Sequence, residues 1–167
     1  MTEFKLGELF CGPGGIAWGA TNATIEDPSF HITHAWANDY DQDTCNTYIK
    51  NINGASDRNV ICADVRKLDI TNFEHIDAFA FGFPCNDFSV VGEQRGFNGT
   101  YGPLYTYGVK VLNYFQPQWF LAENVGGLAS ANEGSALQVI LSDLKKCGYK
   151  LYPHLYKFED YGIPQSR

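Results

Sequence analysis

The sequence predicts an α/β domain built on a doubly wound, mostly parallel sheet. Short apolar runs of strand length alternate along the chain with segments of helical periodicity. Most of these runs end in glycines or in polar side chains, which is typical of the ligand-binding edge of such a sheet. We expect one domain over residues 1–167, because this length supports a single hydrophobic core.

The composition excludes several classes of protein. The net charge of −7 argues against a surface that neutralises many phosphates by itself, so a nucleic-acid partner would need basic surface supplied elsewhere. Five widely spaced cysteines without a C-x-x-C pair predict reduced thiols and no metal site. Without a membrane-length apolar run or a signal sequence, we expect a soluble protein of the cytoplasm or, in a eukaryote, the nucleus.

The first strand is expected over residues 4–10, followed by a glycine-rich loop at 11–15 and a helix from 16 to about 24. Three glycines in this loop allow a tight turn and a close approach of the backbone to a ligand. The loop is either a cofactor loop or an ordinary strand-to-helix turn. Its G-x-G-G spacing differs from G-x-G-x-x-G and disfavours a NAD-binding oxidoreductase.

A second strand over residues 32–37 leads into a polar tip that contains two aspartates. Asp39 is our candidate for accepting hydrogen bonds from ribose hydroxyls. Either Asp39 or Asp41 could instead cap the following helix, expected over residues 44–51. Tyr40 could stack on an adenine ring or simply pack against the protein.

The third and fourth strands also end in residues with possible chemistry. Residues 60–63 form a short strand that ends at Asp64. Residues 78–83 form an unbroken apolar strand that Pro84 closes, so Cys85 begins the loop at the ligand-binding edge. A cysteine is most often a small buried hydrophobe, and its position alone leaves the two interpretations open.

A glycine-bearing segment at 90–103 has little periodicity and predicts a functional lid or disorder. An amphipathic helix over residues 104–115 stops before Pro117, and a fifth strand over residues 119–122 leads into Glu123. Adjacent strand tips would bring Glu123 close to Cys85, although a strand-end glutamate is more often a solvated cap.

The last two elements are a helix and a strand. The helix over residues 136–147 carries Lys145 and Lys146 in its last turn and Gly148 at its end, as helix-capping rules favour. Residues 149–158 alternate between apolar and polar side chains and predict a sixth strand.

Four short motifs, at residues 10–15, 84–89, 123–125 and 162–167, together resemble the cytosine-5 DNA methyltransferases in order and spacing. The resemblance implies a Rossmann-like class I fold that uses S-adenosylmethionine, with S-adenosylhomocysteine as the product and no metal. It also implies double-stranded DNA as the substrate and a role in DNA methylation, such as restriction-modification.

The resemblance implies catalytic roles for three residues. Cys85 would attack carbon 6 of a cytosine flipped out of the duplex, and Glu123 would protonate ring nitrogen 3. Arg167 matches the first arginine of the family's Q-x-R-x-R motif.

The remaining matched positions are expected to bind S-adenosylmethionine: Phe10, Gly12, Gly14, Gly15, Asp39, Tyr40, Asp64 and Pro84. Phe10 would lie against the adenine ring, Asp39 on the ribose and Asp64 on the adenine amino group. The glycines would lie along the methionine portion, and the Pro84 carbonyl would face the cofactor and the target base.

The chain also departs from the family pattern. Asn86 stands where glutamine is usual, and Tyr101 where arginine is frequent. We expect the fold to be incomplete at the C-terminus, with the target-recognition domain, the final strand and the final helix absent, and a second polypeptide as a possible partner. The alternatives are an inactive, regulatory or assembly half of a split methyltransferase and a transfer-RNA cytosine methyltransferase.

Overall fold

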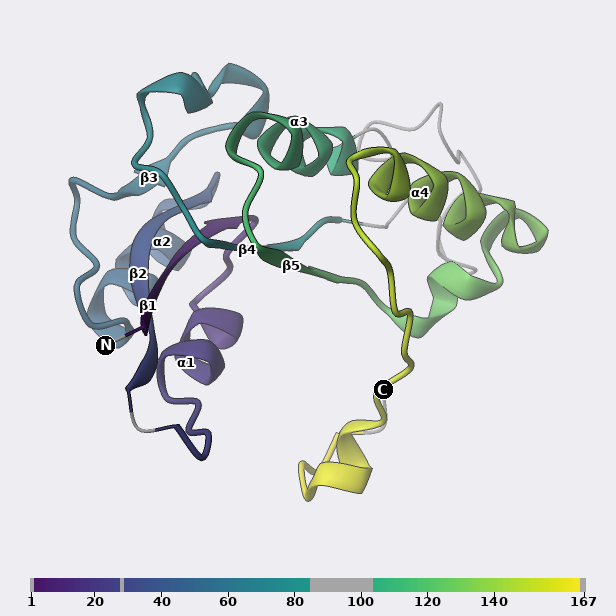
Figure 1. Cartoon of the computed structure of the whole chain (residues 1–167), viewed down its shortest axis with the longest axis horizontal. Helices are drawn as coiled ribbons and strands as arrows, with labels where there is room; N and C mark the ends of the chain where they lie inside the picture. The colour runs from purple at the N-terminus through teal and green to yellow at the C-terminus, as the bar shows by residue number, and fades with distance from the viewer. Residues whose placement is uncertain (1, 28, 85–103, 166–167) are drawn as a thin grey trace. The chain divides into compact units, whose positions relative to one another are not determined.

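The computed structural model describes residues 2–27, 29–84 and 104–165, and its strands form one parallel sheet in the order β3-β2-β1-β4-β5 (Figure 1). Each neighbouring pair of strands runs parallel. The strands are β1 (Thr2–Leu9), β2 (Phe30–Asp39), β3 (Val60–Cys62), β4 (Ala78–Gly82) and β5 (Trp119–Glu123). The predicted parallel α/β architecture is therefore confirmed.

Four α-helices lie in the described part of the chain: α1 (Gly15–Thr21), α2 (Gln42–Asn51), α3 (Tyr105–Phe115) and α4 (Ser135–Lys146). The chain divides into two compact units. Residues 1–83 and 106–123 form the first, which holds the sheet, α1, α2 and nearly all of α3. Residues 84–105 and 124–167 form the second, which holds α4.

Both faces of β4 are buried, and its sequence shows how this is achieved. Successive side chains of a strand point to opposite faces. Ala78 and Ala80 belong to a buried cluster with residues of α1 and α2. Phe79 and Phe81 lie on the other face, where their rings stack with centroids 5.0 Å apart and Phe81 packs against α3. The small alanines on one face of β4 therefore pack in a cluster with α1 and α2, and the large phenylalanine Phe81 on the other face packs against α3.

Most expected element boundaries hold to within a few residues. β2 is two residues longer at each end than expected, and α1 ends at Thr21 rather than near residue 24. Asp41 caps α2, because its Oδ1 accepts a hydrogen bond from the Thr44 N–H at 2.8 Å. Of the two aspartates that could cap this helix, Asp39 and Asp41, the cap is therefore Asp41. Gly148 follows α4 with φ 96°, as a glycine beyond a helix end should.

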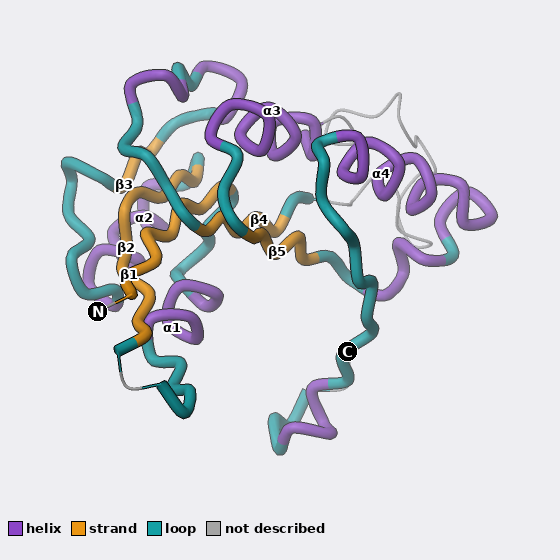
Figure 2. Tube along the Cα trace, viewed as in Figure 1, coloured by secondary structure: helices purple, strands orange, loops and turns teal. Residues whose placement is uncertain are grey.

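The prediction of a strand over residues 149–158 is wrong. This segment has no strand, and Figure 2 draws it as loop up to the short 3-10 helix Phe158–Tyr161. A strand needs a neighbour for its ladder of hydrogen bonds, and in the described residues β5 pairs with β4 alone. The apolar side chains of the alternating pattern, including Tyr152, Leu155 and Tyr156, are exposed, so no packing favours an extended register.

A buried carboxylate lies beneath the glycine-rich loop. Glu8, in β1, accepts a hydrogen bond from the Tyr48 hydroxyl of α2 at 2.5 Å and another from the Ala17 N–H of α1. The same hydroxyl lies 3.2 Å from Nδ1 of His34 in β2. Burial raises the pKa of Glu8 to about 7 and lowers the pKa of His34. Glu8 therefore connects α1 and α2 to the central strand. Its carboxyl group keeps its proton up to a pH well above the usual range for glutamate.

We predict that adding one methyl group at Gly108 destabilises the fold. A Cβ at this position of α3 would lie 2.4 Å from a ring carbon of Phe81, which is buried and stacked on Phe79. Gly108→Ala should lower the free energy of unfolding in urea by about 1–3 kcal/mol. Gly19→Ala in α1 meets nothing within 4 Å and is the matched control, expected to be neutral or stabilising. Equal stabilities of the two variants would contradict this packing.

We also predict that Glu8 makes stability fall as the pH rises. The carboxyl titrates near 4.5 when unfolded and near 7 when folded, so the folded state binds more protons between these values. Relative to Glu8→Gln, the wild-type free energy of unfolding should fall by about 2–3 kcal/mol between about pH 5 and pH 8.

Urea unfolding of both proteins across this pH range measures the difference. His34 titrates in both, so the comparison isolates Glu8. Parallel pH profiles would show that Glu8 is ionised normally in the folded protein.

Candidate functional site

The carboxyl ends of β1 and β2 bring the glycine-rich loop and Asp39 together. Leu9 pairs with Asn38 in the register of these strands. Beyond it, the Cys11 N–H donates to the Asn38 carbonyl oxygen at 3.0 Å, and the Gly12 N–H donates to Asp39 Oδ2 at 3.0 Å. The glycine-rich loop and Asp39, which lie far apart in the sequence, thus meet at one edge of the sheet. We call the ends of β1, β2 and β3, with this loop, Asp39, Tyr40 and Asp64, the rim of the sheet.

The loop itself requires glycine at two positions. Gly12 and Gly14 have φ angles of 55° and 99°, which side-chain-bearing residues rarely adopt. A Cβ on Gly14 would lie 3.0 Å from Ile52, so this side of the loop is packed. A Cβ on Gly12 or Gly15 would meet nothing within 4 Å, so beside these two residues the backbone is open to approach. Phe10, with φ 54°, is half-buried where β1 ends.

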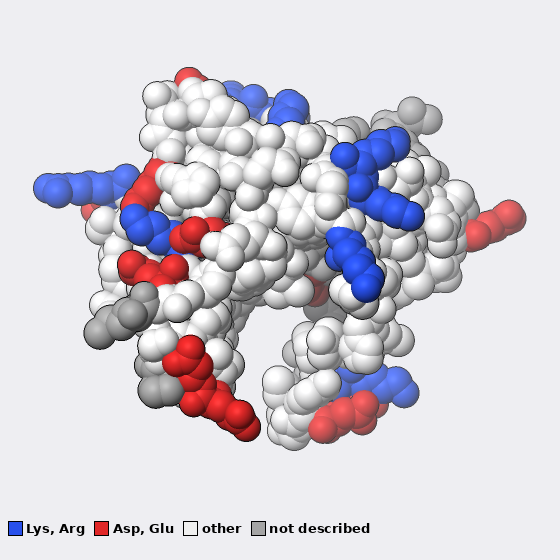
Figure 3. All heavy atoms as spheres, in the orientation of Figure 1, with Lys and Arg blue, Asp and Glu red and all other residues white. Residues whose placement is uncertain are grey.

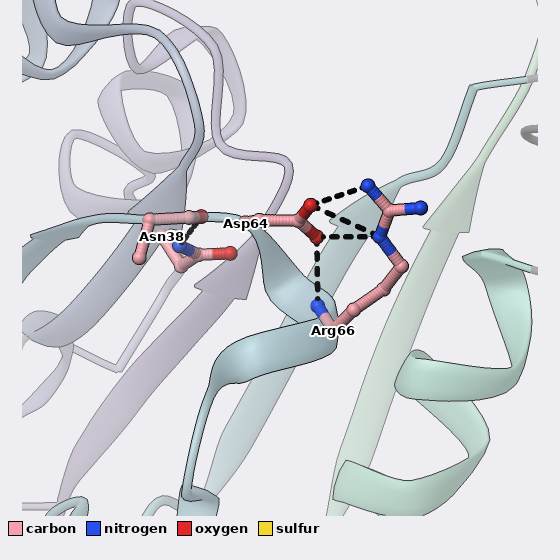
Figure 4. A network of polar contacts seen from close by, with 4 residues as sticks. Asn38, Asp64 and Arg66 are labelled. Carbon is pink, nitrogen blue, oxygen red and sulfur yellow. Dashed lines mark hydrogen bonds and ion pairs between the residues drawn. The ribbon is translucent and has the colours of Figure 1, made fainter.

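Asn38 holds the ends of β2 and β3 together. Its buried Nδ2 donates to the carbonyl oxygens of Ile61 and Ala63, each at 2.8 Å. Figure 4 shows Asn38 beside the segment that carries Asp64. Neither Asn38 nor Glu8 was predicted from the sequence as a functional residue. Their only signal was a polar side chain inside or directly after an apolar strand, which turns and surface strands also produce.

Asp64 is held in place by Arg66. The Arg66 N–H donates to Asp64 Oδ1 at 2.9 Å, and its guanidinium contacts both carboxylate oxygens (Figure 4). These hydrogen bonds from Arg66 lower the pKa of Asp64 to about 2. Asp64 is therefore an ionised acceptor with a fixed orientation at the end of β3. Arg66 was not among the site residues predicted from the sequence.

Tyr40 is 79% exposed, so the alternative that its ring packs against the protein is wrong. The residue follows Asp39, whose Oδ1 accepts a hydrogen bond from the Asp41 N–H at 3.2 Å. The rim thus presents an aromatic ring beside a carboxylate.

Glu123 lies at the adjacent strand ends of β4 and β5, as expected. It is the register partner of Gly82, and its Oε2 would lie 3.1 Å from a Cβ on that glycine. Glycine here leaves room for the carboxylate over the end of β4. Pro84 follows β4, is half-buried and belongs to the second unit.

Several expected functional residues lie outside the part of the chain that the structure describes: Cys85, Asn86, Tyr101, Arg167 and the segment at 90–103. Within the described ranges, no three His, Cys, Asp or Glu side chains are grouped to hold a metal ion. No helix in those ranges has the length and apolar character needed to cross a membrane.

The chain is similar to type II methyltransferases over nearly its whole length. It is 57% identical over 176 residues to the type II methyltransferase M.BbvI of Brevibacillus brevis, covering 99% of this chain and 47% of that protein. It is 34% identical to M.NgoFVII of Neisseria gonorrhoeae, covering 98% of this chain and 41% of the relative. The chain thus spans about half the length of the curated relatives it matches.

Solved structures support the fold. The Dnmt2 methyltransferase of S. pombe superposes with a TM-score of 0.71 at 20% identity, over 99% of this chain and 47% of that one. The Entamoeba histolytica methyltransferase EhMeth gives a TM-score of 0.72 at 18% identity, over 100% and 51%. These similarities confirm the Rossmann-like fold class. The model of the C-5 cytosine-specific DNA methylase family matches residues 4–167, and the chain therefore belongs to this family.

Proposed function

We propose that this chain carries the catalytic core of a DNA (cytosine-5)-methyltransferase, which transfers a methyl group from S-adenosylmethionine to carbon 5 of cytosine. Family membership over residues 4–167 supports the reaction class. The observation that carries the proposal is the register of β4 and β5, because Glu123 faces Gly82, three residues before Cys85. An acid and a thiol are the two groups that activation of a cytosine ring needs, and Cys85 is assigned as the thiol on its sequence motif.

The rim at β1 to β3 has the chemistry to hold S-adenosylmethionine. The open backbone beside Gly12 and Gly15 would accommodate the methionine portion. Each Asp39 oxygen accepts one protein N–H and keeps further acceptor capacity for a ribose hydroxyl. Asp64, an ionised acceptor, would bind the adenine amino group.

Aromatic surface for the adenine ring would come from the exposed Tyr40 and the half-buried Phe10. We assign Gly14 to this site as the residue that packs the loop against α2. Bound S-adenosylmethionine supplies an electrophilic methyl group.

The protein's own residues would prepare the base. The target cytosine must leave the duplex stack before a side chain can reach the face of its ring. Cys85, as a thiolate, would then form a bond to carbon 6, while Glu123 donates a proton to nitrogen 3 and stabilises the added electron density. Carbon 5 thereby becomes nucleophilic. After methylation, loss of the carbon 5 proton expels the thiolate. Pro84 and Arg167 are assigned to this site on their sequence motifs.

DNA binding would require basic surface from outside these 167 residues. The net charge is −7, and most of the face drawn in Figure 3 belongs to uncharged residues, with side chains of both signs among them. We propose that a segment of the same or a second polypeptide supplies the contacts to phosphates and bases, and that the protein is located in the cytoplasm with its DNA substrate.

The covalent step can be trapped. Duplex DNA carrying 5-fluorocytosine cannot lose a proton from carbon 5, so with S-adenosylmethionine the protein should remain attached to the DNA on a denaturing gel. The assay is run with and without a polypeptide that carries the target-recognition part of a relative. Cys85→Ala should abolish the adduct, and Glu123→Gln should slow its formation about 10²–10⁴-fold.

Glu26→Gln changes an exposed loop carboxylate and is the matched control for Glu123→Gln. An adduct that persists in Cys85→Ala, or unchanged rates in Glu123→Gln, would contradict these assignments. No adduct from the wild-type chain under either condition would favour the inactive or assembly role.

Cofactor binding can be tested without DNA. Asp64→Asn replaces an ionised acceptor by a neutral amide, so calorimetric titration should show about 10- to 150-fold weaker binding of S-adenosylmethionine. Asp57→Asn, in an exposed loop, is the matched control and should bind normally. Equal affinities of the two variants would remove Asp64 from the cofactor site.

A further inference from the structure

Two thiols contact consecutive carbonyl oxygens where β2 ends. Cys45 of α2 donates its S–H to the Asp39 carbonyl oxygen with a sulfur-to-oxygen distance of 3.7 Å. Cys62, the last residue of β3, donates to the Tyr40 carbonyl oxygen at the same distance. The Cys62 thiol also lies close enough to the Cys45 thiol to raise the pKa of Cys45. They therefore contact two consecutive peptide groups, the one that joins Asp39 to Tyr40 and the one that joins Tyr40 to Asp41.

The two cysteines differ in access to solvent. Cys45 is 1% exposed, and burial together with the neighbouring Cys62 thiol raises its pKa to about 12. Cys62 is half-buried and is the one cysteine in the described ranges that is not fully buried. A small oxidant from solvent therefore meets Cys62 first, with Cys45 already in contact behind it.

We propose that Cys45 and Cys62 are a redox-sensitive pair that a peroxide converts into a reversible intramolecular disulfide. The Cys62 thiolate attacks one peroxide oxygen, so that an S–O bond forms, the O–O bond breaks and hydroxide leaves. The Cys45 sulfur then attacks the sulfenic sulfur, so that the S–S bond forms, the S–O bond breaks and water leaves. The two thiols lose two electrons and two protons, and hydrogen peroxide becomes two molecules of water.

The disulfide would alter the rim of the sheet. A disulfide has no S–H, so the hydrogen bonds to the carbonyl oxygens of Asp39 and Tyr40 are lost as the sulfurs close to about 2.05 Å. The Asp39 carbonyl also accepts the Ala63 N–H at 2.9 Å, and its carboxylate accepts the Gly12 N–H. A shift of the Asp39 backbone would therefore reach the glycine-rich loop through the hydrogen bond between the Asp39 carboxylate and the Gly12 N–H.

Mass spectrometry tests the disulfide directly. The reduced full chain is treated with hydrogen peroxide, blocked with a thiol alkylator and digested. We expect one linked peptide pair, joining Cys45 to Cys62, that dithiothreitol separates. The pair should be absent in Cys45→Ser and Cys62→Ser and present in Cys147→Ser, which changes a buried thiol after α4. A Cys62 that stops at sulfinic acid, or that links to another cysteine or another chain, would overturn the proposal.

Amide hydrogen exchange tests the consequence for the loop. The Gly12 amide should exchange about tenfold faster in the oxidised protein, the factor expected when one hydrogen bond is lost. Cys62→Ser treated with the same peroxide is the control and should show unchanged exchange at Gly12. Equal exchange in the reduced and oxidised wild type would overturn the coupling between the disulfide and the loop.

The effect on the cofactor rests on the proposed function. Oxidation should weaken binding of S-adenosylmethionine about fivefold or more, with recovery after reduction by dithiothreitol. If the reduced protein does not bind S-adenosylmethionine, the proposed cofactor site fails and the mass-spectrometric result stands alone. If reduced and oxidised proteins bind equally, the disulfide does not regulate the site.

Discussion

The five strands in the described part of the chain all run parallel, and the site depends on this constraint because it puts their carboxyl ends at one edge of the sheet. β1 lies in the middle of the order β3-β2-β1-β4-β5, with β2 and β3 on one side of it and β4 and β5 on the other. The glycine-rich loop follows this central strand. Asp39 and Asp64 follow on one side of it, and Glu123 lies on the other. The proposed cofactor residues and the proposed base-activating acid thus fall on opposite sides of β1.

Buried polar groups hold this edge in place. Glu8 joins the central strand to both helices under the loop, and Asn38 joins the ends of β2 and β3. A buried carboxyl or amide is costly without partners, and both side chains find theirs in the segments they connect. The Gly12 N–H to Asp39 contact then fixes the loop against the second strand. Above it lie the exposed Tyr40 and the half-buried, ionised Asp64, two residues of the proposed cofactor site.

Local rules predicted the parallel sheet well, and they succeeded for physical reasons. Strands buried on both faces read as apolar runs, as at residues 78–83, and helix ends carry capping signals, as at Gly148. The prediction of a strand over residues 149–158 was wrong because an alternating pattern of side chains does not by itself supply a neighbouring strand for backbone hydrogen bonds. A strand forms only where a neighbour accepts its hydrogen bonds.

The amino-acid sequence by itself determined the order of the strands and helices, the glycine-rich loop and the candidate carboxylates at strand ends, because periodicity and turn chemistry are local. The tertiary structure decided which candidates meet. It joined Gly12 to Asp39, put Glu123 opposite Gly82 and made Asp41 the cap of α2. It also brought Cys45 beside Cys62. These contacts depend on strand register and on helix packing. Neither can be read from the spacing of residues along one chain.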